Sequence, residues 1–571
     1  MAIEKKQHKE VDLVGVFRKR FNDLKTERDT NWLPHWKEIN EYIEPRFGKF
    51  LTTETQRGRK KDQKIYNNRA RLSLRTLMSG MMSGVTNPAR PWFALKVGDD
   101  LMSVIRVRQW LDEVETRLQN SFARSNLYTE LPKLYRNMGL YGIGAMLAIE
   151  DFDMVTRYHT FATGEFCVAN DEKLKVGAFY REYQLTVEQV VGEFPWENLS
   201  DKVKNLWNND KLSEKIEIVH AIERNDDRIQ GLLDNKNMKF RSVHFEKGSS
   251  KESSSGSNTK EFLRISGFKR FPVFAPRWEV ESNDEYGTSC PGMEALSDVK
   301  ELQAKQKKKL QAIDRMSNPP VVAPATMVGK ATSTLPGGIS YADERDGAKG
   351  IRALYQIDPR VQELAYDVKE TEERIKETFY VDLFRMVSQS DRREVTAREI
   401  DEQHEEKLLG LGPVLQRLDN ELLDDLVSMQ FERMFEGDLL PPAPPELEGQ
   451  AVRIEYISFL HQAQRSIGIN SIDRLVNFTF TMGKFKPDAM DKINVDRTVD
   501  KYCEFLSAPS TILNSEDEMA AIRQSRAQQQ QAAATGQSML VASEAAKNLS
   551  DTDLDKNNAL RTIAQRFAQQ Q

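Results

Sequence analysis

The chain has 571 residues, of which 30% are charged and 39% are hydrophobic, and its formal net charge is −5. This length excludes a single hydrophobic core, because domains average roughly 150 residues, and it predicts about three or four units. No apolar run approaches the roughly 20 residues of a membrane-spanning helix, and no signal-peptide core is visible, so we expect no membrane segment. The negative charge excludes broad coating of nucleic acid and leaves room for a local basic contact. The three widely separated cysteines fit a reducing compartment without a disulfide framework.

The first quarter of the chain is predicted to be helical. Residues 14–47 place apolar side chains at helical spacing, and we expect Pro34 to break or restart that helix. The same spacing predicts helices over 63–84, 103–124 and 128–149.

A stretch of small residues, proline and aromatics covers residues 77–95. Gly80 and Gly84 lie four apart on one helix face, which lets another backbone approach closely. Pro88 ends the helix because its ring disfavours a helical residue before it. Trp92 and Phe93 then supply a large apolar anchor. Taken alone, these residues indicate a helix end followed by a buried strand.

The character of the sequence changes after Phe161, where short alternating segments replace helical spacing. Thr186 is a suitable N-cap for a helix over 187–194, and the Ser/Gly-rich segment 248–258 is expected to be an exposed hairpin tip. A mixed sheet domain is therefore predicted, with strands over 164–168, 176–183, 216–223, 239–245 and 261–268.

A long amphipathic helix is predicted over 296–316. Six basic and two acidic residues lie between Lys300 and Arg315, and Lys308 and Arg315 fall opposite the apolar seam. We consider Lys305, Lys308 and Arg315 candidates for weak contacts with phosphates. The alternative is an ordinary solvated helix face.

The second half of the chain is predicted to continue as long helices. A helix-poor, Pro/Gly-containing segment over 318–357 separates the first long helix from a second that starts at Asp358–Pro359. Helicity is interrupted over 387–394, where Arg392 and Arg393 are further candidates for contact with phosphates. A long helix to about residue 435 with a kink at 410–413, a strand over 452–457 and a weakly apolar tail after 528 follow.

Motifs that carry chemistry are incomplete. Gly329–Thr332 lacks the first glycine of a phosphate-binding loop, and the motif at His404 lacks the second histidine of a zinc protease. The acidic series that starts at Asp551 lacks the turn glycine and the final glutamate of a calcium loop. We therefore expect no catalytic residue, no cofactor and no metal site.

Several strings, in a fixed order, resemble those of the portal proteins, or head-to-tail connectors, of short-tailed bacteriophages. The resemblance spans roughly residues 15 to 525, and its strings are 77–95, 271–278, 286–289, 396–400, 411–418 with 421–423, and 456–464. Two features depart from the pattern. Cys290–Pro291 stands where the family tends to run directly from serine to proline, and the Ser/Gly-rich insertion begins at Gly248.

The resemblance implies an α+β, mainly helical portal fold that forms a ring, usually of twelve subunits, around a channel. The regions that it implies are a wing over 1–290, stem helices over 291–317 and 358–386 with a clip over 318–357 between them, a tunnel loop over 387–395, a kinked long helix returning to the wing over 396–445, a crown over 446–527 and a C-terminal helical tail or barrel over 528–571.

The implied function is to form the DNA channel at one capsid vertex, to dock the terminase motor during packaging, and then to join head to tail for ejection. The implied channel residues are Lys305, Lys308, Arg315, Arg392 and Arg393. The implied partners are further copies of the chain, double-stranded DNA, the terminase large subunit, the major capsid and scaffolding proteins and a tail adaptor, in a virion assembled in the bacterial cytoplasm. The alternatives are a structural tail adaptor and a terminase-associated enzyme.

Overall fold

The computed structural model describes most of the chain up to residue 461. The described residues are 13–48, 50, 64–102, 104–229, 231–232, 234–247, 262–317, 321–322, 328, 352–353, 361–390, 402–458, 460–461, 475–476, 478–479, 481–482, 498, 519, 521–529 and 531. The chain divides into two compact units, residues 1–478 and 479–571. In the second unit, residues 521–529 are helical.

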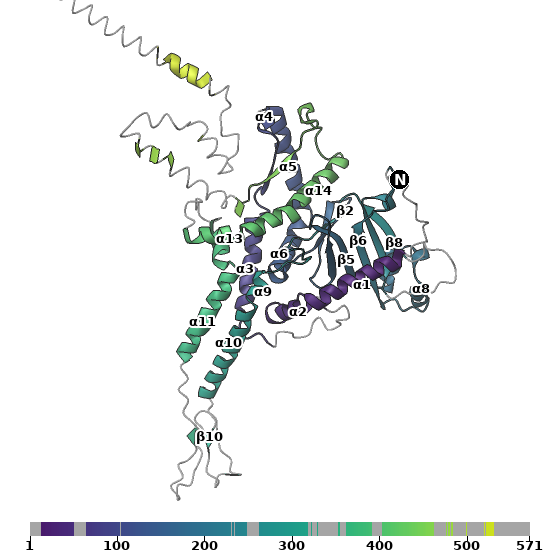
Figure 1. The fold of residues 1–571 in the computed structure, drawn as a ribbon, viewed down its shortest axis with the longest axis vertical. Coiled ribbons are helices and arrows are strands. Elements are labelled where there is room, and N and C mark those ends of the chain that lie inside the picture. The colour runs from purple at the N-terminus through teal and green to yellow at the C-terminus, as the bar shows by residue number, and fades with distance from the viewer. Residues whose placement is uncertain are drawn as a thin grey trace, which may run out of the picture. The chain divides into compact units, whose positions relative to one another are not determined.

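Helices make up most of the first unit (Figure 1). They are α1 (Leu13–Asn31), α2 (Leu33–Tyr42), α3 (Arg69–Gly84), α4 (Asp99–Met102), α5 (Ile105–Arg124), α6 (Leu127–Tyr141), α7 (Val187–Glu193), α8 (Asp201–Asn208), α9 (Pro291–Glu294), α10 (Leu296–Ser317), α11 (Val361–Thr378), α12 (Val381–Ser390), α13 (Glu402–Leu418) and α14 (Asp424–Glu436). Among the described residues, no helix is both long enough and apolar enough to cross a membrane.

The predicted break in the first helix is confirmed. Helix α1 ends at Asn31, and α2 begins at Leu33 with Pro34 in its first turn, where the missing N–H of proline costs nothing. The predicted helix over 63–84 begins later, at Arg69. Phe17 and Phe21 of α1 pack against Tyr180, so α1 covers one face of the larger sheet.

The larger sheet is antiparallel, and its five strands follow one another in chain order. They are β4 (Phe166–Asn170), β5 (Val176–Thr186), β6 (Lys215–Arg224), β7 (Phe240–Glu246) and β8 (Arg264–Phe268). Each strand overlaps a predicted one, which confirms the strand positions, but the pairing is antiparallel throughout and not mixed as predicted. Thr186 caps α7 as predicted, because its hydroxyl accepts the Gln189 N–H while the Gln189 side chain accepts the Thr186 N–H.

A second sheet of three strands corrects one prediction. The helix predicted over 128–149 ends at Gly142, whose φ of +80° suits glycine, and Met146–Asp151 form β2 instead. A side chain at Gly142 would meet the Gly287 carbonyl oxygen at 2.2 Å. The strand order is β3 (Val155–Thr160), β2 and β9 (Val273–Phe274).

The sequence predicts the close approach of another backbone at Gly80, and the structure places a side chain there instead. Phe384 of α12 lies against this glycine, since a side chain built at Gly80 would meet the Phe384 ring at 2.1 Å. Leu77, Leu134 and Leu415 belong to the same continuous core, which joins α3, α6, α12 and α13. Strand β1 (Phe93–Lys96), predicted after the helix end, pairs with β12 (Arg453–Tyr456) and so ties distant parts of the chain together.

Two predicted long helices contain interruptions that the sequence did not predict. The second long helix is divided at Tyr380, whose φ of +53° separates α11 from α12, and α12 continues to Ser390. Pro413 lies inside α13, and a π-helical segment over Asp419–Leu423 joins α13 to α14. The mixture of helices and separate antiparallel sheets confirms the α+β class. Strands β10 (Val321–Val322) and β11 (Arg352–Ala353) pair with each other.

Candidate functional site

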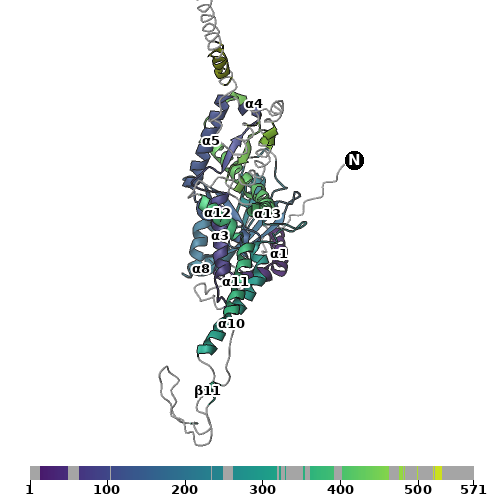
Figure 2. The ribbon, with the colours of Figure 1, turned by 90° about the vertical axis from the view of Figure 1, so that its left-hand side faces the viewer.

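Helix α10 carries the described basic residues that the sequence singles out, and α11 lies beside it in Figure 1 and overlaps it in the turned view of Figure 2. Near α3 their apolar residues are buried, among them Val299, Leu302 and Ile375. Further along, Leu310 and Ile313 of α10 are about half exposed. The helix pair is therefore anchored in the core at one end only.

Complementary charge replaces apolar packing between the two helices. Helix α10 has six basic and three acidic residues, whereas α11 has three basic and six acidic residues. Arg374 of α11 bonds Asp298 at 3.2 Å and Glu301 at 2.9 Å on α10. These hydrogen bonds, the one to Asp298 first, raise the pKa of Arg374.

Lys305 is engaged inside this helix pair. Its ammonium group lies 2.8 Å from an Asp367 oxygen, 3.1 Å from the Thr371 hydroxyl and 2.5 Å from a Glu301 oxygen. Burial lowers the pKa of Lys305, but the hydrogen bonds to Asp367 and Glu301 outweigh it and the pKa is raised. Three partners on two helices make Lys305 a cross-brace between them.

The other candidate residues are placed differently. Lys308 and Arg315 are exposed on α10. Arg392 and Arg393 lie outside the described residues. The structure therefore brings Lys305, Lys308 and Arg315 onto one helix and puts only Lys305 into a network.

A short segment before α3 fastens the helix pair to the rest of the unit. The buried Gln303 amide oxygen accepts the N–H groups of Tyr66 and Asn67 at 2.6 and 2.9 Å, and its amide nitrogen donates to the Asn67 carbonyl. On α11, Glu372 accepts hydrogen bonds from Asn67 and Arg69. The sequence offers no clear signal for this clamp, because Gln303 sits within a charged run.

A buried ion pair that the sequence analysis did not identify joins the end of β4 to the π-helical segment. Arg277 is 1% exposed, and its guanidinium lies 2.7 Å from Glu421, which also accepts the Arg277 backbone N–H. Its other nitrogens donate to Asn170 and to the carbonyl oxygens of Leu174 and Asp284. An arginine between Pro276 and Trp278 in an apolar string was the available signal.

A serine, a histidine and an aspartate form a chain of hydrogen bonds near β12. Ser458 Oγ lies 2.6 Å from His461 Nδ1, and His461 Nε2 lies 3.0 Å from both Asp419 oxygens. In a hydrolytic triad the serine faces Nε2 and the acid faces Nδ1. Here the order is reversed and Ser458 is buried, so the chain of bonds ties the residues after β12 to the π-helical segment.

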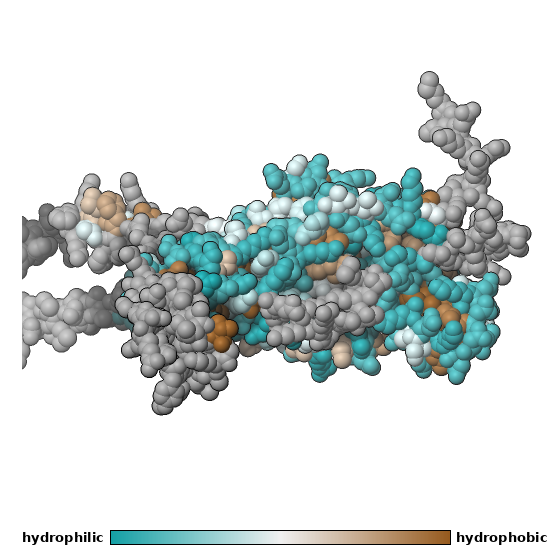
Figure 3. All heavy atoms as spheres, turned by 90° about the horizontal axis from the view of Figure 1, so that it is seen from below, coloured by the Kyte–Doolittle hydropathy of each residue, from teal (hydrophilic) through white to brown (hydrophobic). Residues whose placement is uncertain are grey.

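No group of three His, Cys, Asp or Glu residues lies close enough to hold a metal within the part of the chain that the structure describes. Seen from below, the surface is mainly hydrophilic with separate apolar patches (Figure 3). Such an arrangement can present charge and shape to another molecule.

Comparison with known proteins gives a consistent result along the chain. A family model described as "Bacteriophage head to tail connecting protein" matches residues 15–513. The chain is 40% identical over 547 residues to the portal protein of Salmonella phage epsilon15, with 96% of this chain and 97% of the relative covered. It is 39% identical over 550 residues to the probable portal protein of Bordetella phage BPP-1, with the same coverage of each chain.

Proposed function

Because the chain belongs to the family of bacteriophage head-to-tail connecting proteins, we propose that it forms the portal ring at one vertex of a phage capsid. The match covers residues 15–513, and both relatives carry the name portal protein. In this role the ring surrounds a DNA channel, docks the terminase motor during packaging, and then joins the head to the tail. This full-length match is the observation that carries the proposal, and it favours a portal over a tail adaptor or a terminase-associated enzyme.

The exposed apolar residues of the helix pair support assembly into a ring. Leu310, Ile313 and Met316 on α10 are 40–52% exposed, and Tyr366 on α11 is 72% exposed. Large side chains of this kind are stabilised when a neighbouring copy covers them. A ring, with twelve subunits as the usual number in this family, supplies such a neighbour to every copy.

The proposed regions follow the order of the elements. We assign the wing to residues 1–290, the stem to 291–317 and 358–386, the clip to 318–357 and the crown to 446–527. The tunnel loop over 387–395, the long helix over 396–445 and the tail over 528–571 complete the assignment. The paired α10 and α11 support the stem, because they flank the segment assigned to the clip.

The proposed channel residues divide into two kinds. Lys308 and Arg315 are exposed and available for weak contacts with phosphates. Lys305 acts instead through Asp367 and Thr371 of α11, which keep the stem helices in register. Arg392 and Arg393 belong to the proposed tunnel loop.

The role that we propose is structural and not enzymatic. The chain needs no cofactor of its own, because in this role the terminase partner hydrolyses ATP. Its other proposed partners are the major capsid and scaffolding proteins and a tail adaptor. Assembly in the cytoplasm of the bacterial host, followed by residence at one vertex of the virion, completes the proposal.

Particle imaging and mass measurement of the purified chain test this function. We expect closed rings with a central hole, and a strictly monomeric protein over a wide range of concentration would refute the proposal. The variant Leu310→Asp/Ile313→Asp should weaken ring formation strongly. Ile229→Asp is the matched control, because Ile229 is 62% exposed on another part of the unit, and it should assemble normally.

A further inference from the structure

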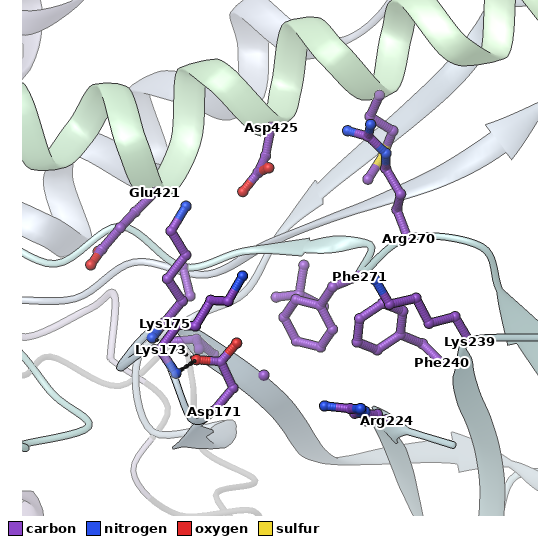
Figure 4. Close-up of a pocket in the computed structure, with 15 residues that line it drawn as sticks. Asp171, Lys173, Lys175, Arg224, Lys239, Phe240, Arg270, Phe271, Glu421 and Asp425 are labelled. Atoms are coloured by element: carbon purple, nitrogen blue, oxygen red, sulfur yellow. Dashed lines mark hydrogen bonds between the residues drawn. The ribbon is translucent and has the colours of Figure 1, made fainter. Parts of the chain in front are cut away.

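A basic pocket lies beneath α14, between the two sheets, and has no assigned role (Figure 4). Its volume is about 460 Å³. Five cationic side chains from separate segments line it, and they are Lys173, Lys175, Arg224, Lys239 and Arg270. We call this cavity the basic pocket.

Some charges of the basic pocket are paired within the subunit and others are not. Arg224 pairs with Asp226, Arg270 with Glu432, and Glu421 with Arg277. Burial raises the pKa of Asp425. Lys173 and Lys239 form no ion pair with any residue that the structure describes. Asp171 also lines the pocket, where its carboxylate accepts the backbone N–H groups of Lys173 and Lys175. An anionic group entering the pocket would therefore meet two lysine side chains that have no ion-pair partner among the described residues.

Aromatic side chains give the basic pocket an apolar side. The rings of Phe240 and Phe271 line it, with centroids 5.4 Å apart, and Val176 and Met429 add further apolar surface. A volume of this size accepts a large side chain, and aromatic rings pack favourably edge to face. The pocket therefore suits a ligand that combines an aromatic ring with negative charge.

The hairpin between β2 and β3 presents such a group. Phe152 at its tip is completely exposed and is flanked by Glu150, Asp151 and Asp153. We call residues 150–154 the acidic tip.

The acidic tip is held in a fixed conformation. The Asp151 carboxylate accepts the N–H groups of Asp153 and Met154 and pairs with Arg157, and these bonds, those of the backbone first, lower its pKa. Val155 has a φ of +66°, an unfavourable value for a β-branched residue. Such strain persists only where the surroundings impose it. A rigid turn therefore holds Phe152 away from its own subunit at little further cost in entropy on binding.

We propose that the acidic tip of one copy inserts Phe152 into the basic pocket of another copy of the chain. The contact is heterologous, since it joins two different surfaces, and repeating it generates a ring when the rotation closes. The inference rests on the proposed portal ring and names a contact that would hold neighbouring copies together. The acids around Phe152 would meet the cations around the pocket, which steers association and fixes its register.

Cross-linking between copies tests the contact directly. In full-length chain with Cys503 replaced by serine, Phe152→Cys and Lys173→Cys should be joined by a short bis-maleimide into covalent dimers and larger multiples. Cys167 and Cys290 are buried and should not react. The matched control combines Phe152→Cys with Lys202→Cys on α8. We expect its chains not to be cross-linked to one another, so they should remain single chains after the reaction. Linkage only within single chains, or none, would overturn the proposal.

Charge reversal separates this inference from the proposed function. The variant Lys173→Glu/Lys239→Glu should raise the protein concentration needed for half assembly by about tenfold, which corresponds to about 1.4 kcal/mol. Adding Glu150→Lys/Asp153→Lys should restore most of that loss, because attraction returns with the signs exchanged. Wild-type assembly by every variant would refute the contact while leaving the portal ring intact. Cross-linked multiples without closed rings would instead support the contact and refute the ring.

Discussion

The body of the first unit and the far part of the α10–α11 pair are stabilised by different interactions. In the body, α3, α6, α12 and α13 share one apolar core whose members are almost fully buried. Arg374 joins α11 to Asp298 and Glu301 of α10, and beyond Gln303 Lys305 joins α10 to Asp367, while Leu310 remains about half exposed. The body can therefore fold from contacts within one chain, whereas the helix pair keeps apolar surface that another molecule can cover.

The two regions also use ion pairs differently. Arg277 and Glu421 in the body are 1% and 10% exposed, so water cannot replace either partner. Arg374 in the helix pair is 43% exposed, and water screens its contacts. Breaking an ion pair should therefore cost much folding free energy in the body and little in the helix pair.

The largest effect is expected from Arg277→Met in the body. The substitution removes the shorter of the two ion pairs of the buried Glu421 carboxylate and leaves Arg417, 3.2 Å away and partly exposed, as its remaining counter-charge, which costs about 3 kcal/mol. Denaturant unfolding of the dissociated subunit measures this loss. The double variant Arg277→Met/Glu421→Met is the control and should be more stable than the single variant, because no charge remains buried. A loss below about 1 kcal/mol for the single variant would contradict the contrast between the regions.

A matched pair of leucine truncations gives the next largest difference. Leu415→Ala in the body removes a fully buried side chain and should cost about 2–5 kcal/mol. Leu310→Ala in the helix pair should change the stability of the dissociated subunit by less than about 0.5 kcal/mol, because half of that side chain already faces water. It should nevertheless reduce ring formation. If both truncations lowered the stability of the dissociated subunit equally, the apolar surface of the helix pair would already be covered within one chain.

The sequence predicts elements well where a local pattern decides them. Alternation gave the five strands of the larger sheet, and Thr186 marked the start of α7. Prediction failed where a contact distant in sequence decides the structure. Gly142 ends α6 because Gly287 lies against it, and helical spacing in residues 146–149 could not reveal that contact.

The candidate site was also predictable only where a local pattern in the sequence reveals it. The basic residues of α10 are visible as a charge run, but the sequence does not show which of them is paired. Lys305 is a cross-brace only because Asp367, 62 residues later, lies opposite it. The partners of Arg277 are likewise spread from Asn170 to Glu421. Pairing across such separations depends on the fold, and no spacing rule reports it.

Glu115 should give the body a pH dependence of smaller size. Burial raises the pKa of this carboxyl from 4.5 to about 7, although it accepts the Leu95 N–H. The protonated form is favoured in the folded state, so this contribution is complete below about pH 4.5 and is lost as the pH rises to 7. Its size is about 2–3 kcal/mol. Unfolding measured from pH 4 to 8 should show the decline in wild type and a flatter profile in Glu115→Gln.

Glu372 on the helix pair provides a control of opposite sign. Burial raises its pKa, but hydrogen bonds from Asn67 and Arg69 outweigh that effect and lower the pKa overall. Its stabilisation is therefore present above the unfolded pKa of 4.5 and lost as the pH falls through the folded value. Glu372→Gln should narrow the stability difference between pH 3 and pH 5.

For Glu115, a stability profile of Glu115→Gln as steep as that of wild type would show that another group causes the loss of stability between pH 4 and pH 8.

The smallest effect is expected from Arg374→Ala. The guanidinium loses its contacts with Asp298 and Glu301, but all three groups are solvated, so the cost should be at most about 1 kcal/mol. Salt sharpens this prediction, because a Debye length of about 3 Å in 1 M salt screens exposed charges and leaves buried ones largely unaffected. The difference between wild type and Arg374→Ala should therefore disappear in 1 M salt, while that for Arg277→Met persists. If salt left the Arg374 effect unchanged, its ion pairs would be as protected as those of the body, and the two regions would not differ in how they use charge.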